Sequence, residues 1–234
     1  MLGDSRAEAE FFRLASHPRR KFHLAYCSGR APQSILELVE SGRLPRPDFI
    51  VGNVGTTMHA LLEGCEGWPE AFSAQAGQDW PAAEIMRLGE GEGVSAQPAE
   101  SLGPHKASFF WDGRSETADA LVRRLQPLGP QKILLMEGRY IDVLPRQLGK
   151  GAAAEFLRRR LRLDSDAVLV AGDAGNDADL FSTGFHGVLP AGALPELRRH
   201  APEGPRIRHS RLAHAWAVIE ALRQLGFLED AEDG

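Results

Sequence analysis

The chain has 234 residues, of which 43% are apolar and 25% are charged, a balance that suits a globular protein with a substantial core. Its formal net charge of −5 argues against a general nucleic-acid or anionic-membrane binder, whose binding face would be basic. No apolar run approaches the ~18–20 residues that cross a bilayer, and no signal-peptide pattern is visible. Two cysteines, Cys27 and Cys65, cannot form a disulfide framework. We therefore expect a cytoplasmic protein.

The first part of the chain alternates helical and strand patterns. Residues 5–17 carry apolar side chains among charges and predict an amphipathic helix. An apolar run at 22–26 predicts a strand, Pro32 begins a helix that reaches Gly42, and residues 49–51 predict a second strand.

The composition changes from about residue 68. Gly, Pro, Ala and Glu dominate residues 89–104, and strands are then predicted at 106–112 and 132–136 around a helix near 116–126. After Pro145, predicted helices alternate with strands; the helices are 151–161, 177–182, 193–200 and 211–225, and the strands are 167–171, 186–189 and 206–209. This alternation predicts a mainly parallel sheet.

The segment Val168-Leu-Val-Ala-Gly-Asp173-Ala-Gly-Asn-Asp177 carries two carboxylates four residues apart, beyond the end of an apolar strand. Ligands of open parallel sheets bind beyond the carboxyl ends of strands, and Mg²⁺ takes carboxylate oxygens together with water or phosphate oxygens. The segment therefore favours a magnesium site at Asp173 and Asp177. The alternative is that Asp177 only caps a helix.

Ser28-Gly29-Arg30 also ends a predicted strand and precedes a helix. A hydroxyl, a glycine and helix-terminal amides can bind a phosphate, although such residues more often form an ordinary turn. Lys150, one residue before the predicted helix 151–161, can add an ammonium group, although a lysine there is more often a solvated charge. The three groups in this order favour a phosphate site.

The order Ser28-Gly-Arg, Lys150-Gly and Gly-Asp173-x-Gly-Asn-Asp177 resembles motifs two, three and four of the haloacid-dehalogenase-like phosphatases. The segments LAYCSGR, PHKASFF, GRYIDVLP, GDAGNDADLF and AHAWAVIEAL are similar to the sucrose-phosphate phosphatase branch. The resemblance runs from Leu2 to Leu228. It implies an α/β fold: a Rossmann-like parallel core, 1–67 and 146–234, with an inserted α/β cap, 68–145.

The resemblance also implies Mg²⁺-dependent hydrolysis of a sugar phosphate. Ser28 and Lys150 would contact the phosphoryl group, with Gly29, Arg30 and Asn176 completing its site. Asp173 and Asp177 would hold Mg²⁺, Asp177 through water. Three further residues lie where that family recognises sugar, namely Lys106, Arg139 and Asp142.

The first motif of that family, Asp-x-Asp-x-Thr at the end of a strand, is absent from these residues. Its first Asp is the nucleophile that becomes an aspartyl phosphate. In the family topology this strand lies between those ending at Ser28 and Asp173, so its absence leaves them roughly 9–10 Å apart or forces them together. We expect the strand to belong to residues ahead of Met1. Asp164, Asp112 and Asp4 do not replace the nucleophile. Asp164 precedes a predicted strand at the opposite edge, Asp112 lies in a turn of the expected cap, and Asp4 is expected to cap a helix.

Two functions stay open. One is a sugar-phosphate phosphatase whose nucleophile lies outside these residues, and the other is an inactive module that binds a phosphosugar or a partner sugar synthase. A nucleotide-binding regulator is disfavoured, because no G-x-G-x-x-G or P-loop segment follows a strand. The sequence does not predict an oligomeric state.

Overall fold

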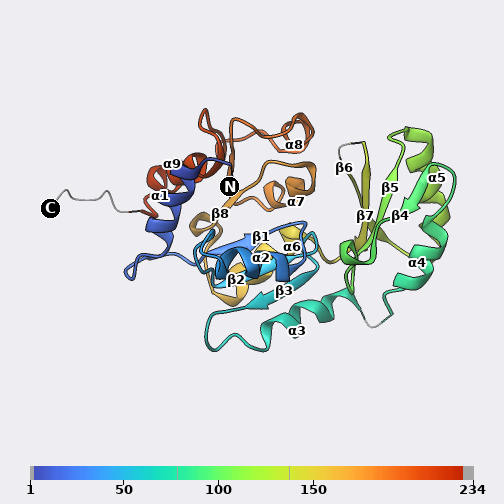
Figure 1. Cartoon of the computed structure of the whole chain (residues 1–234), viewed down its shortest axis with the longest axis horizontal. Coiled ribbons are helices and arrows are strands. Elements are labelled where there is room, and N and C mark those ends of the chain that lie inside the picture. The colour runs from blue at the N-terminus through green and yellow to red at the C-terminus, as the bar shows by residue number, and fades with distance from the viewer. Residues whose placement is uncertain (1–2, 78, 137, 229–234) are drawn as a thin grey trace.

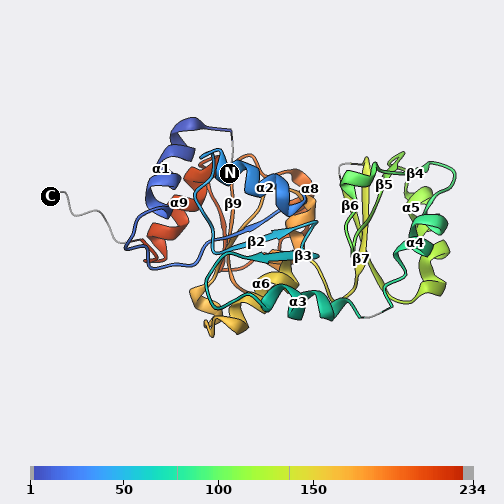
Figure 2. The same cartoon turned by 60° about the horizontal axis from the view of Figure 1, so that its bottom comes forward.

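The computed structural model describes residues 3–77, 79–136 and 138–228; Met1 and Leu2, where the resemblance begins, lie outside the described residues. Figures 1 and 2 show a larger lobe, built from both ends of the chain, and a smaller lobe around β4–β7. Two connections join them, one leaving α3 and the other leaving β7. Within the described residues, no helix is long and apolar enough to cross a membrane.

The larger lobe contains two three-stranded sheets. The first is formed by β1 (Ala25–Cys27), β2 (Phe49–Gly52) and β3 (Thr57–Ala60), with β1 parallel to β2 and β3 antiparallel to it. The second is formed by the parallel strands β8 (Leu169–Ala171), β9 (His186–Leu189) and β10 (Ile207–His209). The mainly parallel sheet expected from the sequence is thus present as two parts, with one antiparallel edge strand.

Among the described residues, seven helices belong to the larger lobe: α1 (Ser5–Ala15), α2 (Pro32–Glu40), α3 (Trp68–Ser73), α6 (Lys150–Arg160), α7 (Ala178–Phe181), α8 (Pro195–His200) and α9 (His214–Gln224). Proline or a capping side chain opens α1, α2, α3 and α8. Asp4 caps α1 by accepting hydrogen bonds from the Arg6 and Ala7 amides. Pro32 opens α2 and Pro195 opens α8.

Apolar packing places α3 with the larger lobe. Phe72 is fully buried in one cluster with Phe49, and the Trp68 ring stacks on Phe49 with centroids 5.5 Å apart. The expected cap range begins at residue 68, yet this packing ties residues 68–73 to the first sheet.

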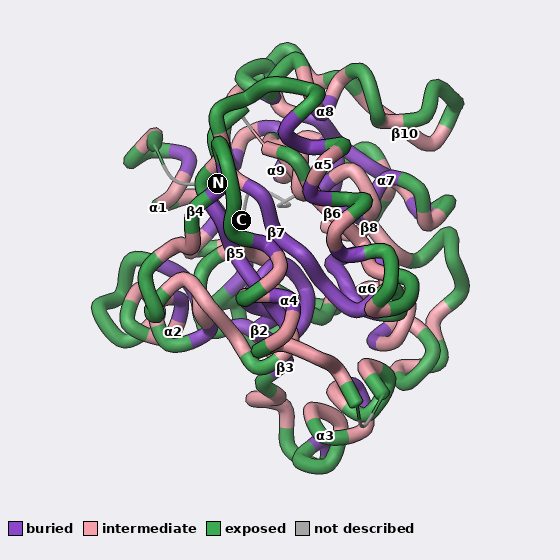
Figure 3. Tube along the Cα trace, turned by 90° about the vertical axis from the view of Figure 1, so that its right-hand side faces the viewer, coloured by how far each residue is buried: buried purple, intermediate pink, exposed green. Residues whose placement is uncertain are grey.

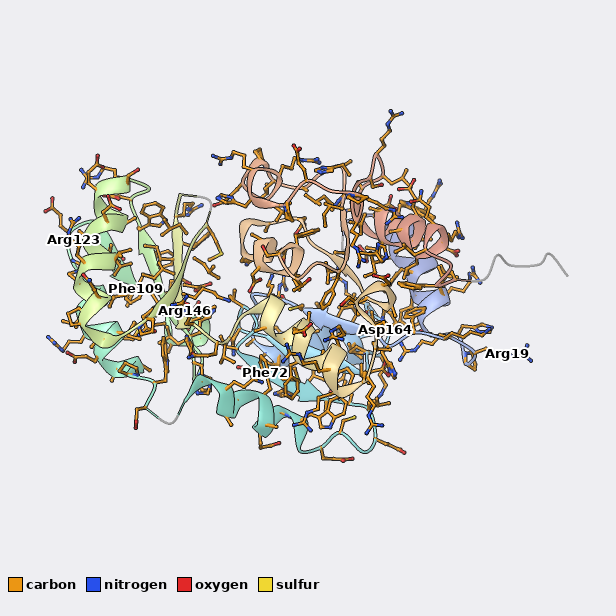
Figure 4. All side chains as sticks on the ribbon, turned by 180° about the vertical axis from the view of Figure 1, so that it is seen from behind. Arg19, Phe72, Phe109, Arg123, Arg146 and Asp164 are labelled. Atoms are coloured by element: carbon orange, nitrogen blue, oxygen red, sulfur yellow. The ribbon has the colours of Figure 1, made fainter. Side chains whose placement is uncertain are left out.

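The smaller lobe is an antiparallel sheet covered on one face by two helices. It contains α4 (Ala82–Gly89), β4 (Val94–Ala96), β5 (Ala107–Trp111), α5 (Ser115–Leu125), β6 (Gln131–Met136) and β7 (Tyr140–Pro145), with strand order β4-β5-β7-β6. Phe109, Ile141 and Leu121 are fully buried in its core. The purple tubes of β5 and β7 in Figure 3 mark this core, and Figure 4 shows Phe109 and Phe72 in separate lobes.

Side chains alternate between the two faces of this small sheet. Ala107, Phe109 and Ile141 point to the helices, so Ser108 and Asp142 belong to the opposite face. The sequence patterns predict β5, β6 and α5, whereas β3, β4, β7, α3 and α4 were not predicted.

Candidate active site

The carboxyl ends of β1 and β8 meet at one edge of the larger lobe. Ser28 follows β1 and Asp173 follows β8, as the sequence predicts. A Cβ atom added to Gly29 would lie 3.3 Å from the Asn176 Nδ2 atom, so the two loops are in close contact. The first residue of α6, Lys150, reaches the same place. The structure therefore brings together residues of all three segments that the sequence predicts to bind phosphate.

Lys150 is nearly fully buried at the start of its helix. Its Nζ atom donates to Asp177 Oδ1 at 2.5 Å and to Asn176 Oδ1 at 2.8 Å. Burial by itself would lower the pKa of Lys150, but the acidic groups that face it, Asp177 foremost with Cys27 and Asp179, together outweigh burial and hold that pKa above its usual range. The lysine is therefore a fixed positive charge at the loop edge. The helix begins at Lys150, one residue earlier than the predicted 151–161.

Asp177 is also engaged by the backbone. Its Oδ2 atom accepts the Asp173 and Ala174 amides at 3.0 and 3.1 Å. The carboxylate thus binds amides that precede it and pairs with Lys150, and it does not cap α7, the helix-capping role that the sequence left as the alternative. Asp173, in contrast, is exposed, and its carboxylate makes no hydrogen bond within the described ranges.

Ser28 closes a tight turn after β1. Its Oγ atom accepts the Arg30 amide at 3.2 Å, which leaves the hydroxyl hydrogen free to be donated. Its main-chain amide donates to Val51 and its carbonyl accepts the Val54 amide, so the turn is fixed to the loop after β2. Arg30 is exposed and lines a cavity between the lobes.

The loop after β2 is strained, and its part in the site was not predicted from the sequence. Asn53, Val54 and Gly55 have φ angles of 51°, 59° and 87°, and a β-branched valine in this region is a clear outlier. The Gly55 carbonyl accepts the Gly149 amide at 3.1 Å. This loop follows a buried strand at the edge of a parallel sheet, where ligands commonly bind. That position is the sequence signal that could have identified the loop as part of the site.

A cavity of about 440 Å³ lies between the lobes. The larger lobe contributes Gly29, Arg30 and Asn53, and the smaller lobe contributes Lys106 and Asp142. It therefore runs from the Ser28 turn to the polar face of the small sheet.

The smaller lobe presents a buried polar group to this cavity. Asp142 Oδ1 accepts the Ser108 hydroxyl at 2.5 Å and lies 3.9 Å from the Lys106 ammonium. Burial raises the pKa of Asp142 and lowers that of Lys106. The structure thus brings two of the three proposed sugar residues together. The third, Arg139, is exposed, lies over the Tyr140 ring at 5.5 Å and does not line the cavity.

A contact between the lobes was not anticipated from the sequence. Lys132 on β6 donates to the Leu148 carbonyl at 2.7 Å and to Asp179 Oδ2 at 3.2 Å. Gly149 lies against this pair: a Cβ there would be 2.5 Å from both the Lys132 Nζ and an Asp179 oxygen. The pair holds the smaller lobe against the start of α6.

We expect Lys132→Met to lower the free energy of unfolding by about 1–2 kcal/mol, because Asp179 would lose its partner while half-buried. Chemical denaturation measures this change. Arg139→Met alters an exposed arginine of the same lobe and is expected to change stability by less than about 0.5 kcal/mol. Equal effects of the two substitutions would contradict a structural role for the pair.

Magnesium fits the carboxylates of this edge in one particular way. Among the described residues, no group of three His, Cys, Asp or Glu side chains is placed to hold a metal. Asp173 has a free carboxylate, whereas both oxygens of Asp177 are engaged. Mg²⁺ commonly binds one or two carboxylates and keeps waters and phosphate oxygens as its other ligands. The residues present suit direct contact with Asp173 and contact through water with Asp177.

The other acidic candidates lie elsewhere. Asp4 caps α1, Asp112 pairs with Arg114 in the smaller lobe, and Asp164 precedes β8 at the opposite edge from Asp173. Within the described residues, none of them approaches the Ser28 turn.

The fold and the order of these loops define a phosphatase-like member of the haloacid-dehalogenase superfamily. The family model of sucrose-6F-phosphate phosphohydrolase matches residues 1–226, and the chain belongs to this family.

Individual relatives agree with this assignment. Over 207 residues the chain is 32% identical to mannosylfructose-phosphate phosphatase of Agrobacterium fabrum, covering 87% of this chain and 83% of the relative. It is 30% identical over 217 residues to glucosylglycerol-phosphate synthase of Pseudomonas anguilliseptica, covering 92% of this chain but only 28% of that relative. The sucrose-phosphatase of Synechocystis sp. PCC6803, solved with sucrose and phosphate, superimposes with a TM-score of 0.87 at 28% identity, covering 97% and 94% of the two chains.

Proposed function

We propose that the chain provides the phosphate- and sugar-binding parts of a cytoplasmic, Mg²⁺-dependent sugar-phosphate phosphatase. A disaccharide phosphate such as sucrose 6-phosphate is the favoured substrate, in line with the family to which the chain belongs. The observation that carries the proposal is the cavity between the lobes, which has the Ser28–Arg30 turn at one end and the Lys106–Asp142 group at the other.

At the phosphate end, each side chain has a role that follows from its contacts. The Ser28 hydroxyl donates to a phosphoryl oxygen, and the amides of Gly29 and Arg30 add further donors. The Lys150 ammonium, oriented by Asn176, balances the charge of the phosphoryl group. Mg²⁺, held by Asp173 and through water by Asp177, would lower the cost of the charge that develops on the phosphoryl oxygens.

At the sugar end, Lys106 and Asp142 offer a donor and an acceptor to sugar hydroxyls. The smaller lobe would act as a cap over the larger one, with residues 1–67 and 146–234 as the core and 68–145 as the cap, except that α3 packs on the core. Its closure would exclude water from the phosphoryl group. We assign Arg139 no more than a peripheral part, since it lies outside the cavity lining.

The proposed chemistry needs a nucleophile beyond those of the described residues. A carboxylate oxygen would attack phosphorus while the phosphorus–oxygen bond to the sugar breaks, and an acid would protonate the departing sugar oxygen. Water would then cleave the aspartyl phosphate to release phosphate and restore the carboxylate. The 234 residues alone are expected to bind the substrate without turning it over.

Calorimetry of the 234-residue chain with sucrose 6-phosphate and Mg²⁺ tests this function. We expect binding that weakens at least about tenfold when Asp173 is replaced by asparagine or Mg²⁺ is removed by EDTA, because the metal links the phosphate to that carboxylate. The matched control is Asp164→Asn, which changes an exposed acid at the opposite edge of the sheet. This variant should bind sucrose 6-phosphate as tightly as the unsubstituted chain does. Binding of sucrose as tightly as its phosphate would refute the proposal. Asp173-dependent phosphate release by this chain would instead overturn the expectation that these residues bind the substrate without turning it over.

A second candidate is a non-catalytic module that regulates a sugar synthase. It is favoured by the match to a relative named as a synthase, of which this chain covers 28%. Such a module would retain Ser28, Lys150 and Asp173 for phosphosugar binding but would gain no phosphatase activity from an added nucleophile. Phosphate release from sucrose 6-phosphate once an aspartate nucleophile is supplied would favour the phosphatase, and binding without release would favour the module.

A further inference from the structure

Asp179, on α7, lies against the start of α6 beside Lys150. A Cβ atom added to Gly149 would be 2.5 Å from an Asp179 carboxylate oxygen. A Cβ atom added to Gly151 would be 2.4 Å from the Asp179 carbonyl oxygen. Asp179 therefore contacts the residues on both sides of Lys150.

Within the described ranges, only one carboxylate oxygen of Asp179 has a hydrogen-bond partner. Its Oδ2 atom accepts the Lys132 ammonium at 3.2 Å, whereas its Oδ1 atom is buried and accepts no hydrogen bond. A buried carboxylate oxygen without a partner is costly, because it has lost its water and gained nothing in exchange. The ion pair with Lys132 is therefore the main compensation for the charge of Asp179.

Asp179 also interacts electrostatically with Lys150. Burial lowers the pKa of Lys150, but Asp177, followed by Cys27 and Asp179, holds that pKa above its usual range. The charges of Asp179 and Lys150 are thus close enough to attract each other, although the Lys150 ammonium donates to Asp177 and Asn176 and not to Asp179.

The start of α6 is where the proposed function places the phosphate. The amino end of a helix attracts anions, because its first amide groups have no acceptor within the helix. Lys150 adds a full positive charge at the same point. An Asp179 carboxylate without a counter-charge would compete with a phosphate for both, and it would also repel the phosphate at short range.

Lys132 supplies this counter-charge from the smaller lobe. Its ammonium also donates to the Leu148 carbonyl at 2.7 Å, so two partners hold it beside Gly149. The Lys132 and Asp179 side chains are each 25% exposed, so water and salt screen this pair less than a pair on the open surface.

We propose that Lys132 is a positioning residue: by pairing with Asp179 it keeps that carboxylate from Lys150, whose ammonium stays on Asn176 and open to a phosphate. This role rests on the proposed function, which places the phosphate at Lys150. Because Lys132 and Asp179 belong to different lobes, the affinity for phosphate depends on contact between the lobes. A bound phosphate favours that contact in turn, since such coupling is reciprocal.

Calorimetry with inorganic phosphate and Mg²⁺ tests this role, because phosphate has no sugar that could touch the smaller lobe. We expect Lys132→Met to weaken phosphate binding about three- to tenfold, the effect of one uncompensated charge at short range. Lys132→Gln can still donate to the Leu148 carbonyl but lacks the charge, and it should weaken binding as methionine does. Lys132→Arg keeps the charge and should bind phosphate within about twofold of the unsubstituted chain.

Asp179→Asn should have an effect that a purely structural role does not predict. It breaks the ion pair but removes the competing charge, so we expect phosphate to bind at least as tightly as to the unsubstituted chain. The double variant Lys132→Met/Asp179→Asn should regain the affinity that Lys132→Met loses. If the pair only held the lobes together, the two single substitutions would weaken binding alike, and that result would overturn the proposal.

Arg123→Met is the matched control for the lost charge. It removes a positive charge from an exposed position on α5 of the same lobe, and Figure 4 shows Arg123 on the side of that lobe that faces away from the larger one. Phosphate affinity should be unchanged in this variant. A loss equal to that of Lys132→Met would assign the effect to the overall charge of the lobe and overturn the role of the pair.

A measurement without ligand separates this role from the proposed function. The chain has four lysines, so NMR can resolve their side-chain signals and single substitutions can assign them. In Lys132→Met the Lys150 ammonium should turn from Asn176 toward Asp179, which moves its signal, and the signal should return in the double variant.

The two measurements fail in different ways. If the Lys150 signal behaves as expected but the unsubstituted chain does not bind phosphate, the effect of Lys132 on Lys150 is upheld and the proposed function is rejected. If the unsubstituted chain and Lys132→Met bind phosphate equally well, the proposed function stands and the positioning role of Lys132 is overturned.

Discussion

Replacing Lys150 with methionine is expected to lower the free energy of unfolding by about 3–5 kcal/mol. The ammonium is nearly fully buried and contacts Asp177 at 2.5 Å and Asn176 at 2.8 Å. Methionine matches its length but leaves the Asp177 carboxylate buried with no counter-charge. An unpaired buried charge costs more than the pair contributes. Urea denaturation of the two chains measures the difference.

A double-mutant cycle separates the ion pair from the loss of packing. Asp177→Asn removes the charge while keeping an oxygen that can accept the Asp173 and Ala174 amides. We expect Lys150→Met to cost about 2–3 kcal/mol less in the Asp177→Asn chain than in the parent. If the two substitutions add without coupling, the pair does not fix this edge of the site, and the proposed orientation of Lys150 toward phosphate is wrong.

Gly55→Ala is expected to destabilise the chain by at least about 3 kcal/mol and to displace the start of α6. The added Cβ would lie 2.1 Å from the Gly149 carbonyl carbon and 2.2 Å from the Lys150 amide nitrogen, which are backbone atoms that cannot turn aside. Sugar-phosphate binding should weaken with stability, because the same contact positions Lys150. Denaturation and calorimetry measure the two effects.

Gly42→Ala is the matched control for this substitution. Gly42 also has a positive φ angle, 72° against 87° for Gly55, but a Cβ there meets nothing within 4 Å. Only the backbone strain remains, which costs about 1–2 kcal/mol, and ligand binding should be unchanged. Similar losses at the two glycines would show that strain, and not close approach, explains the effect at Gly55.

The sequence alone determined which residues make up the proposed phosphate edge. Ser28, Lys150, Asp173 and Asp177 each follow a strand or open a helix, and these local patterns predict that the side chains share one edge of a parallel sheet. The apolar periods also predicted α1, α2, α5 and α9 to within a few residues. Short strands with mixed side chains, such as β3 and β7, show too weak an alternation of apolar and polar residues to be predicted as strands.

Only the tertiary structure decided which of these groups are free to act. Asp173 and Asp177 look equivalent in the sequence, but folding pairs Asp177 with Lys150 and leaves the Asp173 carboxylate exposed. Tertiary contacts also decide the roles of Gly55 and Lys132. Gly55 lies against the backbone of Gly149, and Lys132 pairs with Asp179, and both neighbours are far away in the sequence. Local patterns fix which residues end at an edge, whereas burial and pairing depend on contacts between distant segments, which no local pattern encodes.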